Sequence, residues 1–192
     1  MDDGKAYECG EIRIEQEVMV YRNSYGALYD DIVRFTESDS AGTYVRWRWA
    51  SPYSVAVLPL RSEGTALLVL NYRHAARSAV LEAVKGFGAD KEEPAAVAAR
   101  ELAEELGLQA RHIEFVGTVV SDPGFTNHKL HLFIATELSA TEGRPESTEV
   151  IQGVREVPLH PVAEYLRTGA VQDSVTLVLL EMAYDRTNRG RA

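Results

Sequence analysis

Three glutamates crowded on one face of a short helix constrain this chain more than any other feature. Glu101, Glu104 and Glu105 stand three and four residues apart, so their carboxylates share one side of a helix. Like charges at this spacing cost about 0.2–0.5 kcal/mol per pair, and Arg100 can offset only part of that repulsion. A solvated surface helix would explain three glutamates alone. Mg²⁺, which takes oxygen ligands from carboxylates and phosphates, would explain why they gather.

The residues around these glutamates favour the metal-binding explanation. Pro94 suits a first helical position and Gly107 suits the residue after a helix, which predicts a helix over 94–106. Nine positions fixed in type would occur together by chance with a probability on the order of 10⁻⁷ at average residue frequencies. These nine positions are Gly86, Glu92, Arg100, Glu101, Leu102, Glu104, Glu105, Gly107 and Leu108.

The segment 86–108 resembles the Nudix box, which reads Gly, five residues, Glu, seven residues, then Arg-Glu-aliphatic-any-Glu-Glu-any-Gly-aliphatic. The resemblance implies an α/β fold, an α/β/α sandwich with a mixed sheet. It also implies hydrolysis of a nucleoside diphosphate linked to another moiety, with Mg²⁺ as the cofactor and Mn²⁺ as the alternative. Glu101 and Glu105 are then expected to be the principal metal ligands. Glu104 and the backbone carbonyl of Lys85 are expected to be further ligands.

The catalytic residues implied by the resemblance extend beyond the metal ligands. Glu105, Glu104 and Arg100 are expected to take part in catalysis, and Glu92 and Arg100 to support the loop and the helix. A general base is expected on a loop after the box, and three glutamates lie there: Glu142, Glu146 and Glu149. Glu149 is the preferred base because it directly precedes a predicted strand, which limits how far it can move. Glu104 is the first alternative if no loop glutamate acts.

The flanks of the box resemble those of the ADP-ribose pyrophosphatase branch. The resemblance rests on Asn-Tyr-Arg at 71–73, Leu-Glu-Ala-Val-Lys-Gly at 81–86 and a Ser-Asp-Pro-Gly loop at 121–124. The branch has Pro-Ala where this chain has Val-Lys, and glutamine where it has Asn71. GDP-mannose-type enzymes share most of these flanks. ADP-ribose is therefore the expected substrate, with another sugar nucleotide or a dinucleotide as the alternative.

Five residues are expected to bind the substrate. Arg73, at the end of a strand, offers bidentate donors to phosphate oxygens. The alternative for Arg73 is an ion pair with a surface acid. Trp47 alternates with arginines along a strand and offers a ring on which adenine can stack. The alternative is that this ring closes the core or a dimer interface. The resemblance adds Glu82, Pro123 and Gly124.

The chain is expected to have two parts. The first is an N-terminal antiparallel extension of three strands over 1–50, too small to be stable alone and expected to mediate a homodimer. The second is the Nudix catalytic domain over 51–192. Its expected strands and helices, besides helix 94–106, are strands 54–60, 65–72, 79–84, 113–120, 129–136 and 150–157 and helices 158–167 and 174–186. A glycine-containing loop is expected over 86–91.

The overall charge limits the partners of this chain. A formal net charge of −9 argues against general nucleic-acid binding, and no apolar run is long enough to cross a bilayer. The expected partners are a small-molecule nucleoside diphosphate and a second copy of the chain, with the cytoplasm as the expected location. A module that senses ADP-ribose without cleaving it is the rival function, but such modules usually lose box acids, all of which are present here.

Overall fold

The computed structural model describes residues 12–61, 64–141 and 151–189. The chain forms two compact units, one from residues 1–52 with 122–128 and the other from residues 53–121 with 129–192. We call them unit 1 and unit 2 and describe each by itself. Among the described residues, no helix combines the length and hydropathy that crossing a membrane requires.

Unit 1 is an antiparallel sheet in which one long strand is paired on both sides. Its strands are β1 (Ile12–Gln16), β2 (Met19–Arg22), β3 (Gly26–Phe35) and β4 (Ser40–Trp49). β4 pairs with the whole of β3, whereas β1 and β2 follow one another along the opposite edge of β3. The first of the three expected strands, predicted over 12–21, is interrupted between β1 and β2. There the backbone N–H of Val18 donates to the buried carboxylate of Asp31 at 3.2 Å instead of continuing the ladder.

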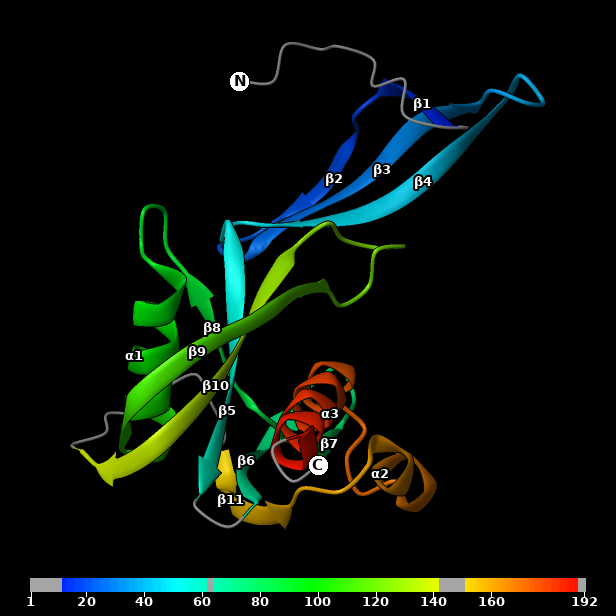
Figure 1. Cartoon of the computed structure of the whole chain (residues 1–192). Coiled ribbons are helices and arrows are strands. Elements are labelled where there is room, and N and C mark those ends of the chain that lie inside the picture. Colours follow the sequence, from blue (N-terminus) through cyan, green and yellow to red (C-terminus); the bar gives the residue numbers. More distant parts are fainter. Residues whose placement is uncertain (1–11, 62–63, 142–150, 190–192) are drawn as a thin grey trace. The chain divides into compact units, whose positions relative to one another are not determined.

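Unit 2 contains a seven-stranded mixed sheet (Figure 1). Its strands are β5 (Tyr53–Arg61), β6 (Thr65–Arg73), β7 (Ser78–Glu82), β8 (Val84–Gly88), β9 (Leu108–Val120), β10 (Lys129–Ala140) and β11 (Ile151–Pro158). The order is β11-β6-β5-β10-β9, with β7 paired to β6 and β8 paired to β5. β5 and β10 run parallel, and the other described pairs are antiparallel, which gives the mixed sheet that was expected.

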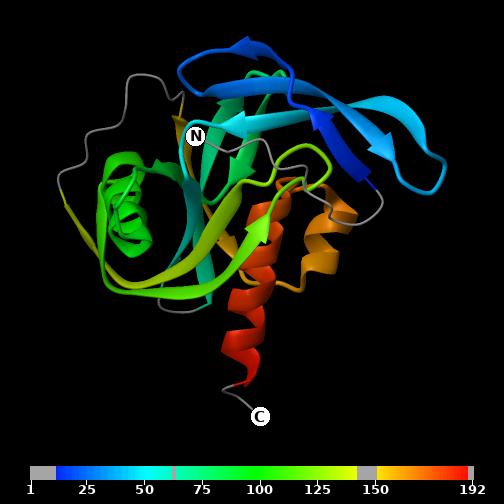
Figure 2. The same ribbon diagram turned by 90° about the horizontal axis from the view of Figure 1, so that it is seen from above.

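Helices cover both faces of this sheet. They are α1 (Pro94–Leu106), α2 (Val162–Thr168) and α3 (Ser174–Arg189). Side chains alternate along β5, so Val55 and Val57 pack in one core with α1, while Ala56 and Leu58 pack in the other with α3. Figure 2 shows α1 and α3 on opposite sides of the sheet. The predicted α/β/α sandwich is confirmed.

The helix that carries the box has the predicted bounds. Pro94 lies in its first turn, and Gly107 ends it in a left-handed conformation with φ of 62°. The N–H of Gly107 donates to the carbonyl of Ala103 at 3.0 Å, which closes the last turn. The next helix starts later than expected, at Val162, because the residue before Pro161 is disfavoured in a helical conformation.

The segment 86–91, expected to be a loop, begins as a strand. β8 pairs with β5 from Val57↔Val84 to Tyr53↔Gly88. A Cβ at Gly88 would lie 2.2 Å from the Tyr53 ring. The glycines of this segment therefore mark places where other groups approach the backbone closely, and not a turn.

Candidate active site

Glu101, the first of the three helix glutamates of the box, lies directly against the box glycine. A Cβ built on Gly86 would be 1.9 Å from both Cδ and Oε1 of Glu101. Glu101 is buried, with 6% of its surface exposed, on the face of α1 that meets β8. Only glycine leaves room for this carboxylate, so a single contact accounts for both the box glycine and Glu101.

Glu105, one turn further along α1, meets the residue before that glycine. Its Oε1 accepts a hydrogen bond from the backbone N–H of Lys85 at 3.2 Å. Glu101 and Glu105 therefore face consecutive residues of β8. This brings together two expected metal ligands and the residue whose carbonyl is the expected further ligand.

Arg100 contacts three of the four box glutamates. Its Nη1 lies 2.8 Å from Oε1 of Glu101 and 2.9 Å from Oε2 of Glu104, and its Nε lies 3.5 Å from Oε1 of Glu92. Nη2 donates to the carbonyl of Phe87 at 3.1 Å. Burial alone would lower the pKa of Arg100, but the carboxylates of Glu101, Glu104 and Glu92 outweigh burial and raise it. Arg100 therefore stays charged and links the helix to β8 and the loop.

The loop before α1 is fixed from two sides. Oε2 of Glu92 accepts from the N–H of Ala89 at 3.1 Å, and the hydroxyl of Tyr53 donates to the carbonyl of Glu92. The Tyr53 ring fills the space above Gly88. Burial, followed by the charges of nearby glutamates, raises the pKa of Tyr53, so the hydroxyl keeps its proton. Tyr53 could not be identified from the sequence, because nothing local to it shows that β5 pairs with β8.

The donor groups of α1 and β8 fit a divalent cation in kind. Glu101, Glu105 and the backbone carbonyls of β8 are hard oxygen donors, which Mg²⁺ and Mn²⁺ prefer. The glycine at 86 leaves the Glu101 carboxylate room beside that backbone. Within the described ranges, no three or more His, Cys, Asp or Glu side chains are arranged to hold a metal ion. Glu101 and Glu104 both contact Arg100, whereas Glu105 contacts the backbone of β8.

Arg73 and Glu82, two of the expected substrate-binding residues, are in contact. Glu82 is buried, and its Oε1 lies 2.5 Å from Nη2 of Arg73, which is 43% exposed. Oε2 of Glu82 lies 3.2 Å from Nζ of Lys85, which also lies 2.7 Å from Oδ1 of Asp173. Burial would raise the pKa of Asp173, but Lys85 and hydrogen bonds from Thr176 outweigh burial and lower it. Asp173 and Thr176 were not predicted to belong to the site, although an aspartate just before a helix is an N-cap signal.

The other three expected substrate-binding residues belong to unit 1. Trp47 lies on β4, its ring centroid 5.7 Å from that of Trp49 in an edge-on arrangement. Pro123 and Gly124 lie in a turn that is closed by hydrogen bonds to the carbonyl of Asp122. Glu142, Glu146 and Glu149 lie outside the described residues.

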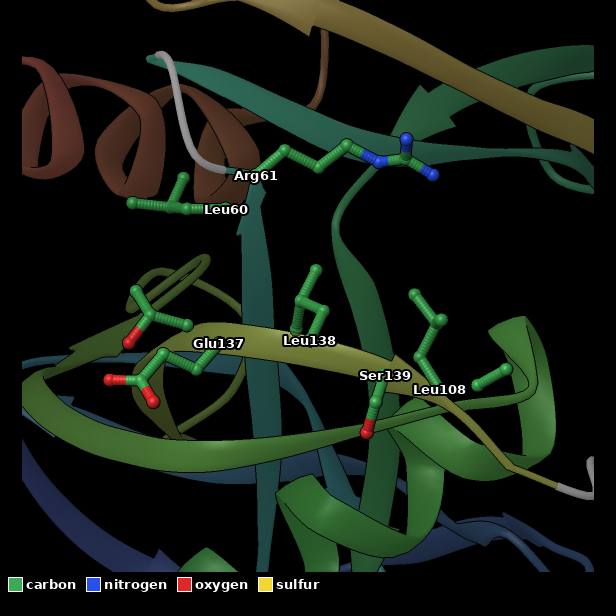
Figure 3. A pocket seen from close by; sticks show the side chains of 8 residues that line it. Leu60, Arg61, Leu108, Glu137, Leu138 and Ser139 are labelled. Carbon is green, nitrogen blue, oxygen red and sulfur yellow. The ribbon is translucent and has the colours of Figure 1, made fainter.

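A pocket of about 650 Å³ lies elsewhere in unit 2 (Figure 3). The pairing of β5 with β10 ends at Pro59↔Ala135. From Leu60 onward β5 pairs with β6 instead, so β5 and β10 separate beyond Pro59. No box acid lines this pocket. Its lining residues are Leu60, Arg61, Leu108, Thr136, Glu137, Leu138, Ser139 and Ala140.

Comparisons with known proteins agree with this geometry. The chain is 31% identical over 131 residues to the ADP-ribose pyrophosphatase of Bacillus subtilis (strain 168), covering 68% of this chain and 71% of that protein. It is 27% identical over 180 residues to the methanol dehydrogenase activator of Bacillus methanolicus, covering 93% and 94%. The crystal structure of an ADP compounds hydrolase superposes with a TM-score of 0.81 at 19% identity, covering 97% of this chain and 99% of that one, and so shares the fold.

The family model of the NUDIX domain matches residues 50–178, well over half of the chain. This span contains the box helix, β8 and the contacts between them. Nudix hydrolases generally need a divalent metal, which agrees with the hard donors found here. The chain belongs to the Nudix family and is a Nudix hydrolase.

Proposed function

We propose that this enzyme cleaves the pyrophosphate of ADP-ribose with Mg²⁺ as its metal, giving AMP and ribose 5-phosphate. The observation that carries the proposal is the contact of Glu101 and Glu105 with consecutive residues of β8, which gathers oxygen donors at one place. The similarity to an ADP-ribose pyrophosphatase supports the choice of substrate.

The residues of the chain have distinct parts in this reaction. Arg73 is anchored through one nitrogen by Glu82, so its remaining N–H groups can donate to the phosphate oxygens of the substrate. Glu101, Glu105 and the carbonyl of Lys85 would hold Mg²⁺, which when bound neutralises phosphate oxygens and lowers the pKa of water. Arg100 keeps the box acids in place. Glu149 would accept the proton of the attacking water as the bond between phosphorus and the bridging oxygen breaks.

A homodimer and a cytoplasmic location complete the proposal. Several large apolar side chains of unit 1 are exposed, and exposed apolar side chains that lie together often mark an interface. They are Met19, Val20, Tyr21, Tyr25, Tyr44 and Val45. This exposed apolar surface supports pairing with a second copy of the chain.

A substrate panel tests the proposed function. ADP-ribose, GDP-mannose, NADH and diadenosine polyphosphates would each be offered with Mg²⁺ and with Mn²⁺, and the products separated by chromatography. We expect the highest kcat/KM for ADP-ribose, with AMP and ribose 5-phosphate as products. A higher kcat/KM for GDP-mannose would make GDP-mannose the substrate in place of ADP-ribose. Tight binding of ADP-ribose without turnover would favour a sensing module.

Two variants check that the activity belongs to this site. Glu105→Gln removes one carboxylate charge from the expected metal site, and we expect it to abolish turnover while the circular dichroism spectrum is unchanged. Glu164→Gln, on the exposed surface of α2, is the matched control and should keep full activity. A Glu105→Gln enzyme with near-native activity would contradict the assignment.

A further inference from the structure

The corner between β7 and β8 is attached to the first turn of α3. The backbone N–H of Ala83, which lies at this corner, donates to Oγ1 of Thr176 at 2.8 Å. Ala83 and Thr176 are both fully buried. A buried N–H that loses its acceptor is costly, so this bond fixes the corner to the helix.

Asp173 extends this attachment back to β8. Its Oδ2 accepts from the N–H of Thr176 at 2.8 Å, as an N-cap does, and from the Thr176 hydroxyl at 2.6 Å. Its Oδ1 lies 2.7 Å from Nζ of Lys85. The interactions therefore form a closed ring: the Ala83 N–H, the Thr176 hydroxyl, the Asp173 carboxylate and the Lys85 ammonium, two residues along the chain from Ala83.

The ring shares Lys85 with the site. The N–H of Lys85 donates to Glu105, and the next residue, Gly86, packs against Glu101. The ammonium of Lys85 also contacts Glu82, whose other oxygen holds Arg73. A shift of Lys85 would therefore move the carbonyl expected to bind the metal and loosen the partner of the expected phosphate ligand.

We propose that Lys85, through its side chain, and Asp173 and Thr176 are positioning residues that keep β8 and Glu82 in register with the box helix. The proposal rests on the proposed function, since it concerns how that site is held. It makes α3, which carries no box residue, a part of the active-site scaffold. None of these three side chains needs to touch the substrate.

A merely structural ion pair is the alternative, and a neutral variant separates the two. Asp173→Asn keeps the N-cap, because asparagine caps a helix as well as aspartate does, but removes the charge that Lys85 faces. We expect a melting temperature close to that of the wild type. We also expect KM for ADP-ribose, and the Mg²⁺ concentration for half-maximal activity, to rise about tenfold, because a misplacement of about 1 Å can cost a hundredfold in rate.

Further variants complete the test. Lys85→Met keeps the aliphatic stem and should raise the same two constants. Combining it with Asp173→Asn should add little, because both substitutions remove the ion pair between Lys85 and Asp173. Arg167→Met, which breaks the surface pair with Glu164 on α2, is the matched control and should change neither constant. Thr176→Val removes the hydroxyl that accepts from the Ala83 N–H. If Thr176→Val does not fold, Asp173→Asn alone decides between the positioning role and a merely structural ion pair.

Metal binding gives a readout that does not depend on turnover. Calorimetry with Mn²⁺ should show weaker binding to Asp173→Asn than to the wild type and to Arg167→Met. If no substrate of the panel is cleaved, the proposed function fails while this measurement still tests the positioning role. The proposal is overturned if Asp173→Asn leaves KM, kcat and Mn²⁺ affinity at the wild-type values, whatever its melting temperature.

Discussion

Replacing Gly86 by alanine would place a methyl group where the Glu101 carboxylate lies. The new Cβ would be 1.9 Å from Cδ and Oε1 and 2.5 Å from Cγ, whereas ordinary contact begins at 3.4 Å. The difference, 3.4 minus 1.9, requires a retreat of about 1.5 Å. Overpacking of this kind costs about 1–3 kcal/mol, and each kcal/mol lowers Tm by about 2–4 °C for a chain of this size.

The loss of activity should exceed the loss of stability. Whether Glu101 moves or β8 is pushed away, the carboxylate leaves its place beside the backbone of β8. A displacement of about 1 Å near the chemistry can cost a hundredfold, so we expect kcat/KM for ADP-ribose to fall by at least about 10². The Tm increase produced by Mg²⁺ should disappear as well, because a ligand stabilises only the state that binds it.

Two other glycines provide matched controls for this substitution. Gly117→Ala adds the same methyl group to β9, 4.0 Å from Cε of Met182, and should preserve both Tm and activity. Gly88→Ala meets the Tyr53 ring at 2.2 Å, so it should cost similar stability without displacing Glu101 directly. If Gly86→Ala keeps the activity and the Mg²⁺ response of Gly117→Ala, the contact does not place the carboxylate and the reasoning fails.

Three further predictions concern other parts of the chain. Burial, and then the charge of Lys129, lower the pKa of His131 from its ordinary value near 6.5, so the unfolded chain binds more protons below that value. The free energy of unfolding should therefore fall as the pH drops below 6.5, and His131→Gln should show a smaller Tm loss between about pH 7.5 and pH 5.5 than the wild type. Light scattering at micromolar concentration should give the mass of a dimer, and Tyr21→Glu should give a monomer; a wild-type monomer would contradict the proposed pairing. Glu149→Gln should lower kcat by about 10²–10⁴ with little change in KM, whereas Glu146→Gln should not; the reverse result would move the base by three residues.

The box helix could be predicted from the sequence because its signals are local. Pro94, the spaced glutamates and Gly107 lie within a few turns of one another, and each has a meaning that does not depend on the rest of the chain. The fold class followed from the same pattern, because the resemblance fixed which sheet and helices surround such a helix.

The strand β8 was missed because its glycines are required by distant groups. Gly86 and Gly88 look like turn residues until Glu101 and Tyr53 are seen packed against them. The contact between Lys85 and Asp173 could not be predicted from the sequence either. Lys85 lies far along the chain from α3, and no local pattern indicates that it contacts the aspartate that caps this helix. Tertiary contacts of this kind decide local structure wherever local preference is weak.

The parallel pairing of β5 with β10 has a consequence for how the protein is made. Residues 54–59 of β5 find their partners in residues 130–135, after α1 and β9 have been synthesised. On the ribosome, the antiparallel partner β8 can join β5 early, while the other edge of β5 waits for β10 to emerge. Pairings between segments so distant in the sequence form slowly, because the intervening chain must be ordered first. We therefore expect the pairing of β10 with β5 to be a late step of folding, with this edge of β5 exposed until it occurs.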